Sequence, residues 1–147
     1  MLQIRRIKPE DIDFVLGQAK ESDCSESKLL TNIENFLICE SDGNKCGCGC
    51  LMTLGNIGIM RWVMVKESYR RNKLGGAITK ALLNIADRKD IKEVYATGIC
   101  GDFLIAMGFI KQESKDIAED IRVILGDIGA EYYKVLLEGY FKPCSHN

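Results

Sequence analysis

The fold is decided by residues 65–77, which read Val65-Lys66-Glu67-Ser68-Tyr69-Arg70-Arg71-Asn72-Lys73-Leu74-Gly75-Gly76-Ala77. An apolar run ends at Val65, a basic loop follows, and apolar residues then return at helical spacing. The first turn of a helix leaves N–H groups without partners inside the helix, and the helix dipole adds positive charge there. Glycines let a bulky anion approach the backbone. The stretch predicts a phosphate-binding turn between a strand and a helix, although similar loops also precede helices that bind nothing.

The elements on both sides of this loop are predicted from apolar periodicity. After it, five apolar residues fall on one helical face and predict a helix from about Gly75 to Arg88: Leu74, Ile78, Ala81, Leu82 and Ile85. Before it, the interior of the strand Gly58–Lys66 is apolar except for Arg61, so both of its faces are expected to be covered. A hairpin is expected at Ser41-Asp42-Gly43-Asn44, where Gly and Asn tolerate positive φ angles.

The remaining chain alternates between the two patterns. Further strands are expected at Leu2–Lys8, Phe36–Glu40, Lys45–Thr53, Glu93–Thr97, after Gly108-Phe109-Ile110, and at Glu131–Leu137. Further helices are expected from Pro9 through Ala19, and at Ser27–Asn35, Asp102–Met107 and Ile117–Leu125. This order predicts an α/β protein with a sheet covered by helices.

Composition and charge restrict the function classes. With 147 residues the chain is expected to form one domain, residues 1–141, with a C-terminal tail at residues 142–147. The net charge is -1 and no basic face is concentrated, which argues against nucleic acid as a partner. The absence of a long apolar run argues against a membrane span, and the charged N-terminus argues against a signal peptide. A cytoplasmic protein is expected.

Three segments together resemble one known family, the GNAT acetyltransferases. Residues Val65 to Gly75 resemble its motif V-x-P-x-Y-R followed by R/Q-x-x-G-x-G/A. Gly47-Cys48-Gly49-Cys50-Leu51 resembles the G-x-x-x-L segment, and residues 103–109 resemble F-Y-x-x-x-G-F. Two positions depart from the pattern: Glu67 replaces proline, and Lys73 replaces the middle glycine. The second change is expected to be tolerated if Lys73 keeps an ordinary helical backbone.

This resemblance implies a GNAT fold, in which helices flank a mixed central sheet of about six to seven strands. It also implies acetyl-coenzyme A as cosubstrate. The backbone of Val63, Met64 and Val65 would pair with the pantetheine amides. The pyrophosphate would be held by Arg70, Arg71, Asn72, Lys73, Leu74, Gly75, Gly76 and Ala77. The reaction would transfer an acetyl group directly to the amine of a small molecule, and the segments look most like the amino-acid-acetylating (N-acetylglutamate synthase-like) subgroup.

The resemblance leaves the acid–base residues open. Ile59 stands where many relatives carry a glutamate, and Leu104 stands where many carry a tyrosine that protonates the leaving thiolate. Three interpretations follow. An ordered water acts as base, or other residues have taken over, with Cys100, Asp102 and Tyr95 as candidates. Alternatively, the protein is an acyl-coenzyme A-binding or sensing module without efficient transfer.

Other residues carry weaker hypotheses. Arg61 could bind a substrate carboxylate with both oxygens, but a structural ion pair is the expectation. Trp62 is expected in the core. The aromatic residues near the end could line an acceptor pocket, pack a homodimer interface or finish the core: Tyr132, Tyr133, Tyr140 and Phe141.

The seven cysteines are expected to be reduced thiols. Cys46, Cys48 and Cys50 alternate with glycines, so in a regular strand the three thiols would lie on one face. Neighbours on one face lie roughly 6.5–7 Å apart, too far to share a small ion easily. A fourth ligand would have to come from Cys39, Cys144 or His146. Buried thiols acting as small apolar side chains are expected instead, and no metal site is predicted.

Overall fold

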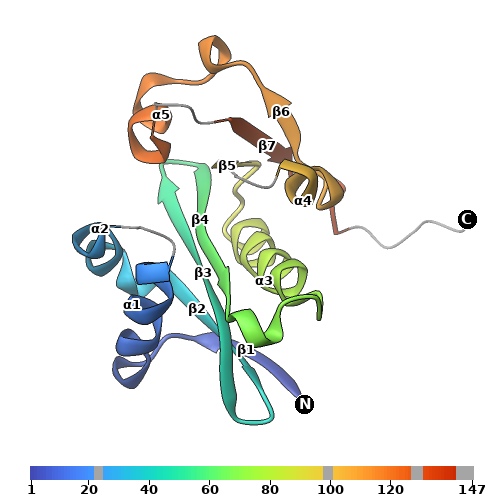
Figure 1. Cartoon of the computed structure of the whole chain (residues 1–147). Coiled ribbons are helices and arrows are strands. Elements are labelled where there is room, and N and C mark those ends of the chain that lie inside the picture. Colours follow the sequence, from blue (N-terminus) through green and yellow to red (C-terminus); the bar gives the residue numbers. More distant parts are fainter. Residues whose placement is uncertain (22–24, 98–100, 127–130, 142–147) are drawn as a thin grey trace, which may run out of the picture. The chain divides into compact units, whose positions relative to one another are not determined.

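The computed structural model describes residues 1–21, 25–97, 101–126 and 131–141. Its strands are β1 (Leu2–Arg6), β2 (Phe36–Ser41), β3 (Asn44–Leu54), β4 (Ile57–Val65), β5 (Glu93–Thr97), β6 (Ile110–Gln112) and β7 (Tyr132–Leu136). Its α-helices are α1 (Ile12–Glu21), α2 (Glu26–Thr31), α3 (Leu74–Arg88), α4 (Gly101–Ala106) and α5 (Glu119–Leu125). Short 3-10 turns are η1 (Pro9–Asp11), η2 (Ile33–Asn35), η3 (Glu67–Tyr69) and η4 (Ser114–Asp116). The predicted α/β class is confirmed (Figure 1).

The strands form one mixed sheet in the order β1-β2-β3-β4-β5-β7-β6. The pairs β1–β2, β2–β3, β5–β7 and β6–β7 are antiparallel. The chain passes from β4 through the helix α3 to β5. Such a helical connection is typical of neighbouring parallel strands. The hairpin between β2 and β3 is present, but Asp42 (φ 51°) and Gly43 (φ 83°) adopt the positive φ angles, and Asn44 already belongs to β3.

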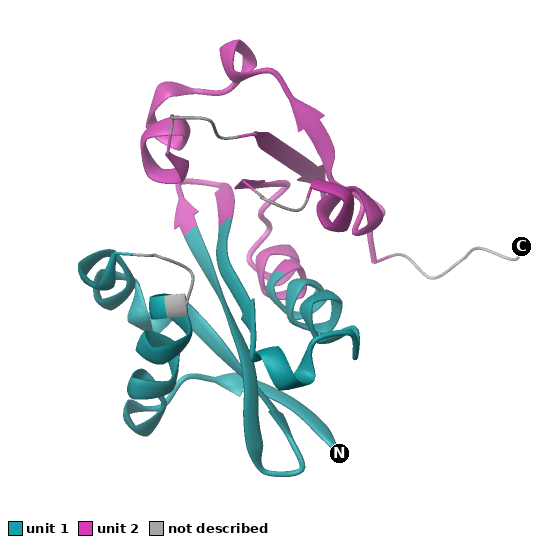
Figure 2. Cartoon of the chain, in the orientation of Figure 1, with its two compact units in different colours: residues 1–52, 60–82 teal, residues 53–59, 83–147 magenta. Residues whose placement is uncertain are grey.

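The described residues group into two compact units (Figure 2). The first comprises residues 1–52 and 60–82, and the second comprises residues 53–59 and those described from 83 onward. In neither unit does a described helix have the length and apolarity needed to cross a bilayer.

In the first unit, a hydrophobic cluster joins α1 and α2 to strands β2 to β4. Its buried members come from each of these elements: Val15, Ala19, Leu29, Phe36, Ile38, Cys48, Cys50 and Met64. On α1, Val15 and Ala19 are buried in this cluster, and the half-buried Leu16 packs against it. Cys48 and Cys50 behave as the small apolar side chains that the sequence predicts.

Glycines on β3 face the helix α3. A Cβ atom on Gly47 would lie 2.9 Å from Ile78 Cδ1 and 2.9 Å from the carbonyl oxygen of Met64. A Cβ atom on Gly49 would lie 2.7 Å from Ile78 Cγ2 and 3.0 Å from Leu82 Cδ1. The alternation of Gly and Cys therefore has a packing cause: α3 passes so close to the strand that only hydrogen fits on that side.

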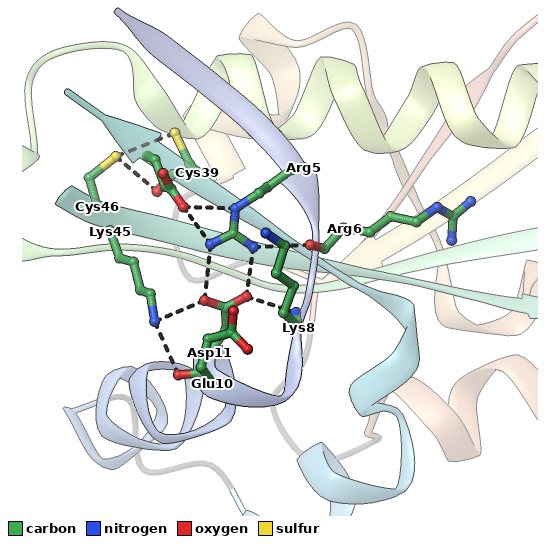
Figure 3. Close-up of polar contacts among 9 residues, drawn as sticks. Arg5, Arg6, Lys8, Glu10, Asp11, Cys39, Lys45 and Cys46 are labelled. Carbon is green, nitrogen blue, oxygen red and sulfur yellow. Dashed lines mark hydrogen bonds and ion pairs between the residues drawn. The ribbon is translucent and has the colours of Figure 1, made fainter. Parts of the chain in front are cut away.

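A buried charge network ties the start of the chain to the hairpin (Figure 3). The carboxylate of Asp11, which is fully buried, accepts hydrogen bonds from Arg5 Nη1 (2.6 Å), Arg5 Nη2 (3.0 Å) and the Lys8 N–H (2.7 Å). Lys45 Nζ lies 2.8 Å from Asp11 Oδ1, and Arg5 Nε donates to Glu40 Oε1 at 2.7 Å. The hydrogen bonds from Arg5 hold the pKa of Asp11 well below its usual range.

In the second unit, the late aromatic residues mostly finish the core. Tyr132 and Tyr133 are 2 % exposed, and Tyr132 donates a hydrogen bond to the carbonyl of Gly126 at 2.6 Å. Tyr140 donates to the carbonyl of Met107 at 2.7 Å, and its ring meets the more exposed Phe141 edge-on at 4.9 Å. Of the three alternatives for these aromatic residues, a place in the core agrees with the burial of Tyr132 and Tyr133.

Candidate functional site

The predicted phosphate-binding residues form one continuous segment of the first unit. Strand β4 ends at Val65, the single turn η3 follows, and α3 begins at Leu74. Residues 70–73 are exposed, whereas Leu74 is buried and residues 75–77 are half-buried. The strand–loop–helix order read from the sequence is therefore present, with its polar residues turned to solvent.

The segment displays a row of free backbone donors. Among the residues that the structure describes, none accepts a hydrogen bond from the backbone N–H groups of residues 71–76. The first such donor with a backbone partner is Ala77, which bonds to the carbonyl of Lys73 at 3.3 Å. Six consecutive N–H groups without backbone acceptors in the described part of the chain, at the start of a helix, place partial positive charges next to one another, which is the chemistry that binds phosphate oxygens.

The charges around this row favour an anion. The first turn of α3 contains no acidic residue, so the positive end of a 15-residue helix is not neutralised locally. Arg71 and Lys73 are exposed, while Arg70 donates from Nε to the carbonyl of Val65 at 3.0 Å and so braces the loop against β4. The segment combines backbone donors with exposed cationic side chains at the same place.

The condition under which lysine was expected to be tolerated at position 73 is not met. Lys73 does not keep an ordinary helical backbone: its φ angle is 60°, and that of Arg71 is 77°. Both lie in the left-handed region, where a side chain costs about 1–2 kcal/mol relative to the right-handed form. The middle position of the motif thus keeps the backbone geometry that glycine allows, although a lysine occupies it. The loop stores backbone strain at Lys73, and the side chain of this exposed residue offers no buried packing to offset it.

Replacement of Lys73 by glycine is expected to stabilise the protein. Relief of about 1–2 kcal/mol of left-handed strain exceeds the roughly 0.5–1 kcal/mol that glycine loses in chain entropy, so a net gain of about 0.5–1 kcal/mol follows. Urea denaturation measures it. Lys80→Gly, the same change at an exposed position within α3, should instead lose about 1 kcal/mol. Equal losses in both variants would contradict the strain assigned to the loop.

Strand β4 is distorted three residues before its end. Trp62 has a φ angle of 54°, a left-handed backbone inside a strand, and the three residues 61–63 are all half-buried instead of alternating. The Trp62 ring stacks on Phe36 at 5.9 Å between centroids, and the Arg61 guanidinium lies 4.3 Å above the Trp62 ring. Trp62 is therefore half-buried and packs against the core cluster. A cation–π contact with its ring helps to position the guanidinium of Arg61.

The candidate acid–base residues belong to the second unit. Tyr95 on β5 is 7 % exposed, and Lys134 Nζ lies 5.8 Å from its ring and 3.4 Å from Glu93 Oε1. Burial, assisted by the Glu93 charge, raises the pKa of Tyr95 and keeps its phenol protonated. Asp102 is exposed in the first turn of α4, and Cys100 lies outside the described residues. Among the described residues no hydrogen bond joins Tyr95 to Asp102.

The two positions at which relatives carry acid–base residues are apolar and buried here. Ile59 is fully buried and Leu104 is 4 % exposed. A tyrosine that the sequence left unassigned, Tyr133, lies against the start of α4: its hydroxyl occupies the space that a Cβ on Gly101 would need. It donates to Glu131 Oε2 at 2.9 Å, and this bond raises its pKa. Only tertiary structure reveals this position, because no sequence spacing links Gly101 to Tyr133.

The cysteine-rich strand does not gather metal ligands. Among the described residues no group of three or more His, Cys, Asp or Glu side chains could hold a metal ion. The one-face arrangement of the three strand thiols fails at Cys46. Its thiol contacts Cys39 on β2, because the register of β2 and β3 shifts between Cys39 and Glu40. Cys144 and His146 lie outside the described residues.

Comparison of the sequence with known families finds one domain. A model described as an acetyltransferase (GNAT) domain matches residues 32–111, more than half of the chain. The matched region runs from before β2 through the loop and α3 into β6. A comparison with curated protein sequences found no significant match.

Solved structures of similar fold include several acetyltransferases. N-acetylglutamate synthase from Neisseria gonorrhoeae, complexed with coenzyme A and N-acetyl-glutamate, superimposes with a TM-score of 0.81 at 20% identity over 93% of this chain. This chain spans only 35% of that protein. A GNAT-family acetyltransferase from Staphylococcus aureus gives 0.75 at 19% identity, covering 93% of this chain and 99% of the other. The PaiA N-acetyltransferase from Thermoplasma acidophilum, in complex with coenzyme A, gives 0.75 at 17% identity, covering 92% and 99%. At these identities the likeness shows a shared fold.

Proposed function

Because the chain belongs to the GNAT acetyltransferase family, whose cosubstrate is acetyl-coenzyme A, we propose that it transfers an acetyl group to the amine of a small molecule. The observation that carries the proposal is the row of unpartnered N–H groups at residues 71–76, set at the start of α3 beside exposed cationic side chains. A pyrophosphate fits this arrangement because its oxygens need several donors that converge from one side.

Each part of the segment has a role in holding the cosubstrate. The N–H groups of residues 71–76 bind the pyrophosphate, and Arg71 and Lys73 add charge around it. The backbone of residues 63–65 at the end of β4 pairs with the pantetheine amides. Gly47 and Gly49 have no side chain, so α3 can pack closely on β3. This close packing fixes the start of the helix relative to β4. The cosubstrate is held mainly by backbone, which explains why a lysine at the middle glycine position is compatible with binding.

The transfer itself needs little covalent chemistry from the protein. The amine nitrogen attacks the thioester carbonyl carbon, the new C–N bond forms, and the C–S bond breaks. The amine loses a proton and the coenzyme A thiolate gains one. Holding the two reactants in line supplies much of the acceleration, and an ordered water, Tyr95, Asp102 or Cys100 handles the protons.

An amino acid is the acceptor class that this proposal assigns to the chain. Arg61 has its guanidinium placed over the Trp62 ring at 4.3 Å on the distorted part of β4. A guanidinium oriented in this way can bind a carboxylate through two parallel hydrogen bonds while its face stays on the ring. The N-acetylglutamate synthase of similar fold was crystallised with an N-acetylated amino acid, which supports the same class for this chain.

A second candidate function is an acyl-coenzyme A-binding or sensing module. It is favoured by the burial of Ile59 and Leu104, which leaves both usual acid–base positions without a titratable group. Binding of the cosubstrate is common to both candidates. Turnover separates them.

The test is release of free coenzyme A thiol from acetyl-coenzyme A, measured against a panel of amines. The proposed function predicts release above the blank only with an amine present, and faster release with an amino acid than with its decarboxylated amine. Arg61→Gln should remove the preference between this pair, because the guanidinium that binds the carboxylate is gone. Tight binding of the cosubstrate with no amine-dependent release would instead support the sensing module.

A further inference from the structure

Two thiols lie in direct contact between β2 and β3 (Figure 3). Cys46 Sγ is 3.4 Å from Cys39 Sγ and donates a hydrogen bond to the carbonyl oxygen of Cys39 at 3.2 Å. Both side chains are fully buried. The transfer reaction assigns neither of them a role.

A fault in strand pairing creates this contact. Cys39 pairs with Gly47, but the next residue, Glu40, pairs with Lys45, so Cys46 is an extra residue on β3 with no opposite partner. Such a bulge kinks its strand and aims the extra side chain in a new direction. Here the thiol is aimed at Cys39. The bulge leaves Cys46 outside the β2–β3 ladder, so the residue can move toward β2 without breaking a pair of that ladder.

We propose that Cys39 and Cys46 form a redox-sensitive pair, which closes into an intramolecular disulfide on oxidation by a peroxide and thereby lowers the affinity of the neighbouring loop for acetyl-coenzyme A. One thiol releases its proton, its thiolate sulfur attacks a peroxide oxygen and the O–O bond breaks, which gives a sulfenic acid and a hydroxide that takes up the released proton to become water. The second thiol then attacks the sulfenic sulfur, the S–S bond forms, and a second water leaves. Two thiols lose two electrons, and hydrogen peroxide is reduced to two waters.

The geometry requires a small movement. A disulfide has an S–S distance of about 2.05 Å, so the two sulfur atoms must approach by about 1.4 Å from their present separation of 3.4 Å. The bulge at Cys46 can supply this displacement. Burial, together with the hydrogen bond with Cys46, raises the pKa of Cys39 to about 12, so that thiol stays protonated in the closed fold. Oxidation therefore proceeds through brief opening of the exposed hairpin end at residues 42–44.

The pair is connected to the proposed cosubstrate site through two short contacts. The carbonyl of Cys46 accepts a hydrogen bond from the N–H of Lys66 at 2.8 Å, and Lys66 is the first residue after β4. The next residue, Gly47, lies so close to the carbonyl of Met64 that a Cβ would come within 2.9 Å of it. If Cys46 moves toward Cys39, these contacts displace the end of β4, where the proposed cosubstrate-binding loop begins. This part of the inference rests on the proposed function.

The experiment treats the reduced full-length chain with hydrogen peroxide, maps thiols by peptide mass spectrometry, and measures acetyl-coenzyme A affinity by calorimetry. The expected result is loss of about 2 Da from the pair of peptides that contain Cys39 and Cys46, reversed by dithiothreitol. The dissociation constant should rise about fivefold on oxidation. Cys48→Ala, a matched change on the same strand, should respond as the wild type does. Cys39→Ala and Cys46→Ala should show neither effect.

Each contrary result has a defined meaning. If the two residues stay as thiols, or appear only as separate sulfinic acids, the pair does not close and the inference is overturned. If the disulfide forms but the affinity stays unchanged, the coupling to the loop is wrong. Failure of the reduced protein to bind acetyl-coenzyme A would overturn the proposed function and the coupling, while the mass measurement would still decide on the disulfide.

Discussion

Replacement of Asp11 by alanine is expected to lower the free energy of unfolding by about 3 kcal/mol, the lower end of the cost of breaking a buried ion pair by removal of one partner. The carboxylate is fully buried, and Arg5 and Lys45 both approach it within 3.0 Å. Without the Asp11 carboxylate, the positive charge of Arg5 is only partly compensated, although the Arg5 side chain is only 16% exposed. Arg5 retains Glu40 as a partner, which limits the loss of stability. Urea denaturation at neutral pH measures the free energy of unfolding of the wild type and the variant.

The pH dependence of the free energy of unfolding shows whether the charge of Asp11 causes the expected destabilisation. The folded-state pKa of Asp11 is lowered by its hydrogen bonds with Arg5. Its contribution is therefore present above the unfolded value of about 4 and disappears as the pH falls through the folded value. The wild type should lose stability below about pH 4 more steeply than Asp11→Ala. Curves that stay parallel down to low pH would show that the variant loses packing alone.

Replacement of Gly47 by alanine is expected to destabilise the protein by about 2 kcal/mol, a typical cost of overpacking. The added methyl would lie 2.9 Å from the carbonyl oxygen of Met64, a backbone atom within the sheet that cannot rotate away. The strain should push α3 and β4 apart and weaken acetyl-coenzyme A binding as well. Thermal denaturation and calorimetry measure the two effects.

Gly17→Ala is the matched control for this change. Gly17 lies in α1, and a Cβ there would meet no atom within 4 Å. Alanine should stabilise that helix by about 0.5–1 kcal/mol and leave binding unchanged. A Gly47→Ala protein as stable as the wild type would contradict the close approach of α3 to β3.

Local patterns predicted most of the elements because each of them has a strong periodic signal. Leu74, Ile78 and Leu82 on one face predict the helix α3, and Gly43 and Asn44 in the segment Ser41-Asp42-Gly43-Asn44 predict the hairpin. The expected helix at Ser27–Asn35 was less accurate, because the helix ends at Thr31 and a separate 3-10 turn follows. The family resemblance supplied the mixed sheet of about six to seven strands, whereas the order of the strands within it was not predicted and comes from the structure.

The parts that could not be predicted depend on contacts between distant residues. Asp11 was visible only as a charge near a helix start, whereas its partners Arg5 and Lys45 come from two strands. The left-handed backbone of Lys73 contradicts the expectation from its residue type, since the position is set by the loop and not by the side chain. The alternation of cysteines predicted one common face, and the bulge at Cys46 broke it.

The central claim is that residues 70–77 hold the pyrophosphate of acetyl-coenzyme A, and calorimetric titration of three proteins tests it most directly. They are the wild type, Gly75→Glu, and Asn84→Glu, which adds the same charge at an exposed position later in α3. A carboxylate beside the pyrophosphate costs about 4 kcal/mol per pair of charges at 4 Å, so Gly75→Glu should weaken binding more than about a hundredfold. Melting curves verify that each variant is folded. The account predicts that the wild type and Asn84→Glu bind alike and that folded Gly75→Glu does not bind. Equal binding by all three proteins, or by none, would contradict it.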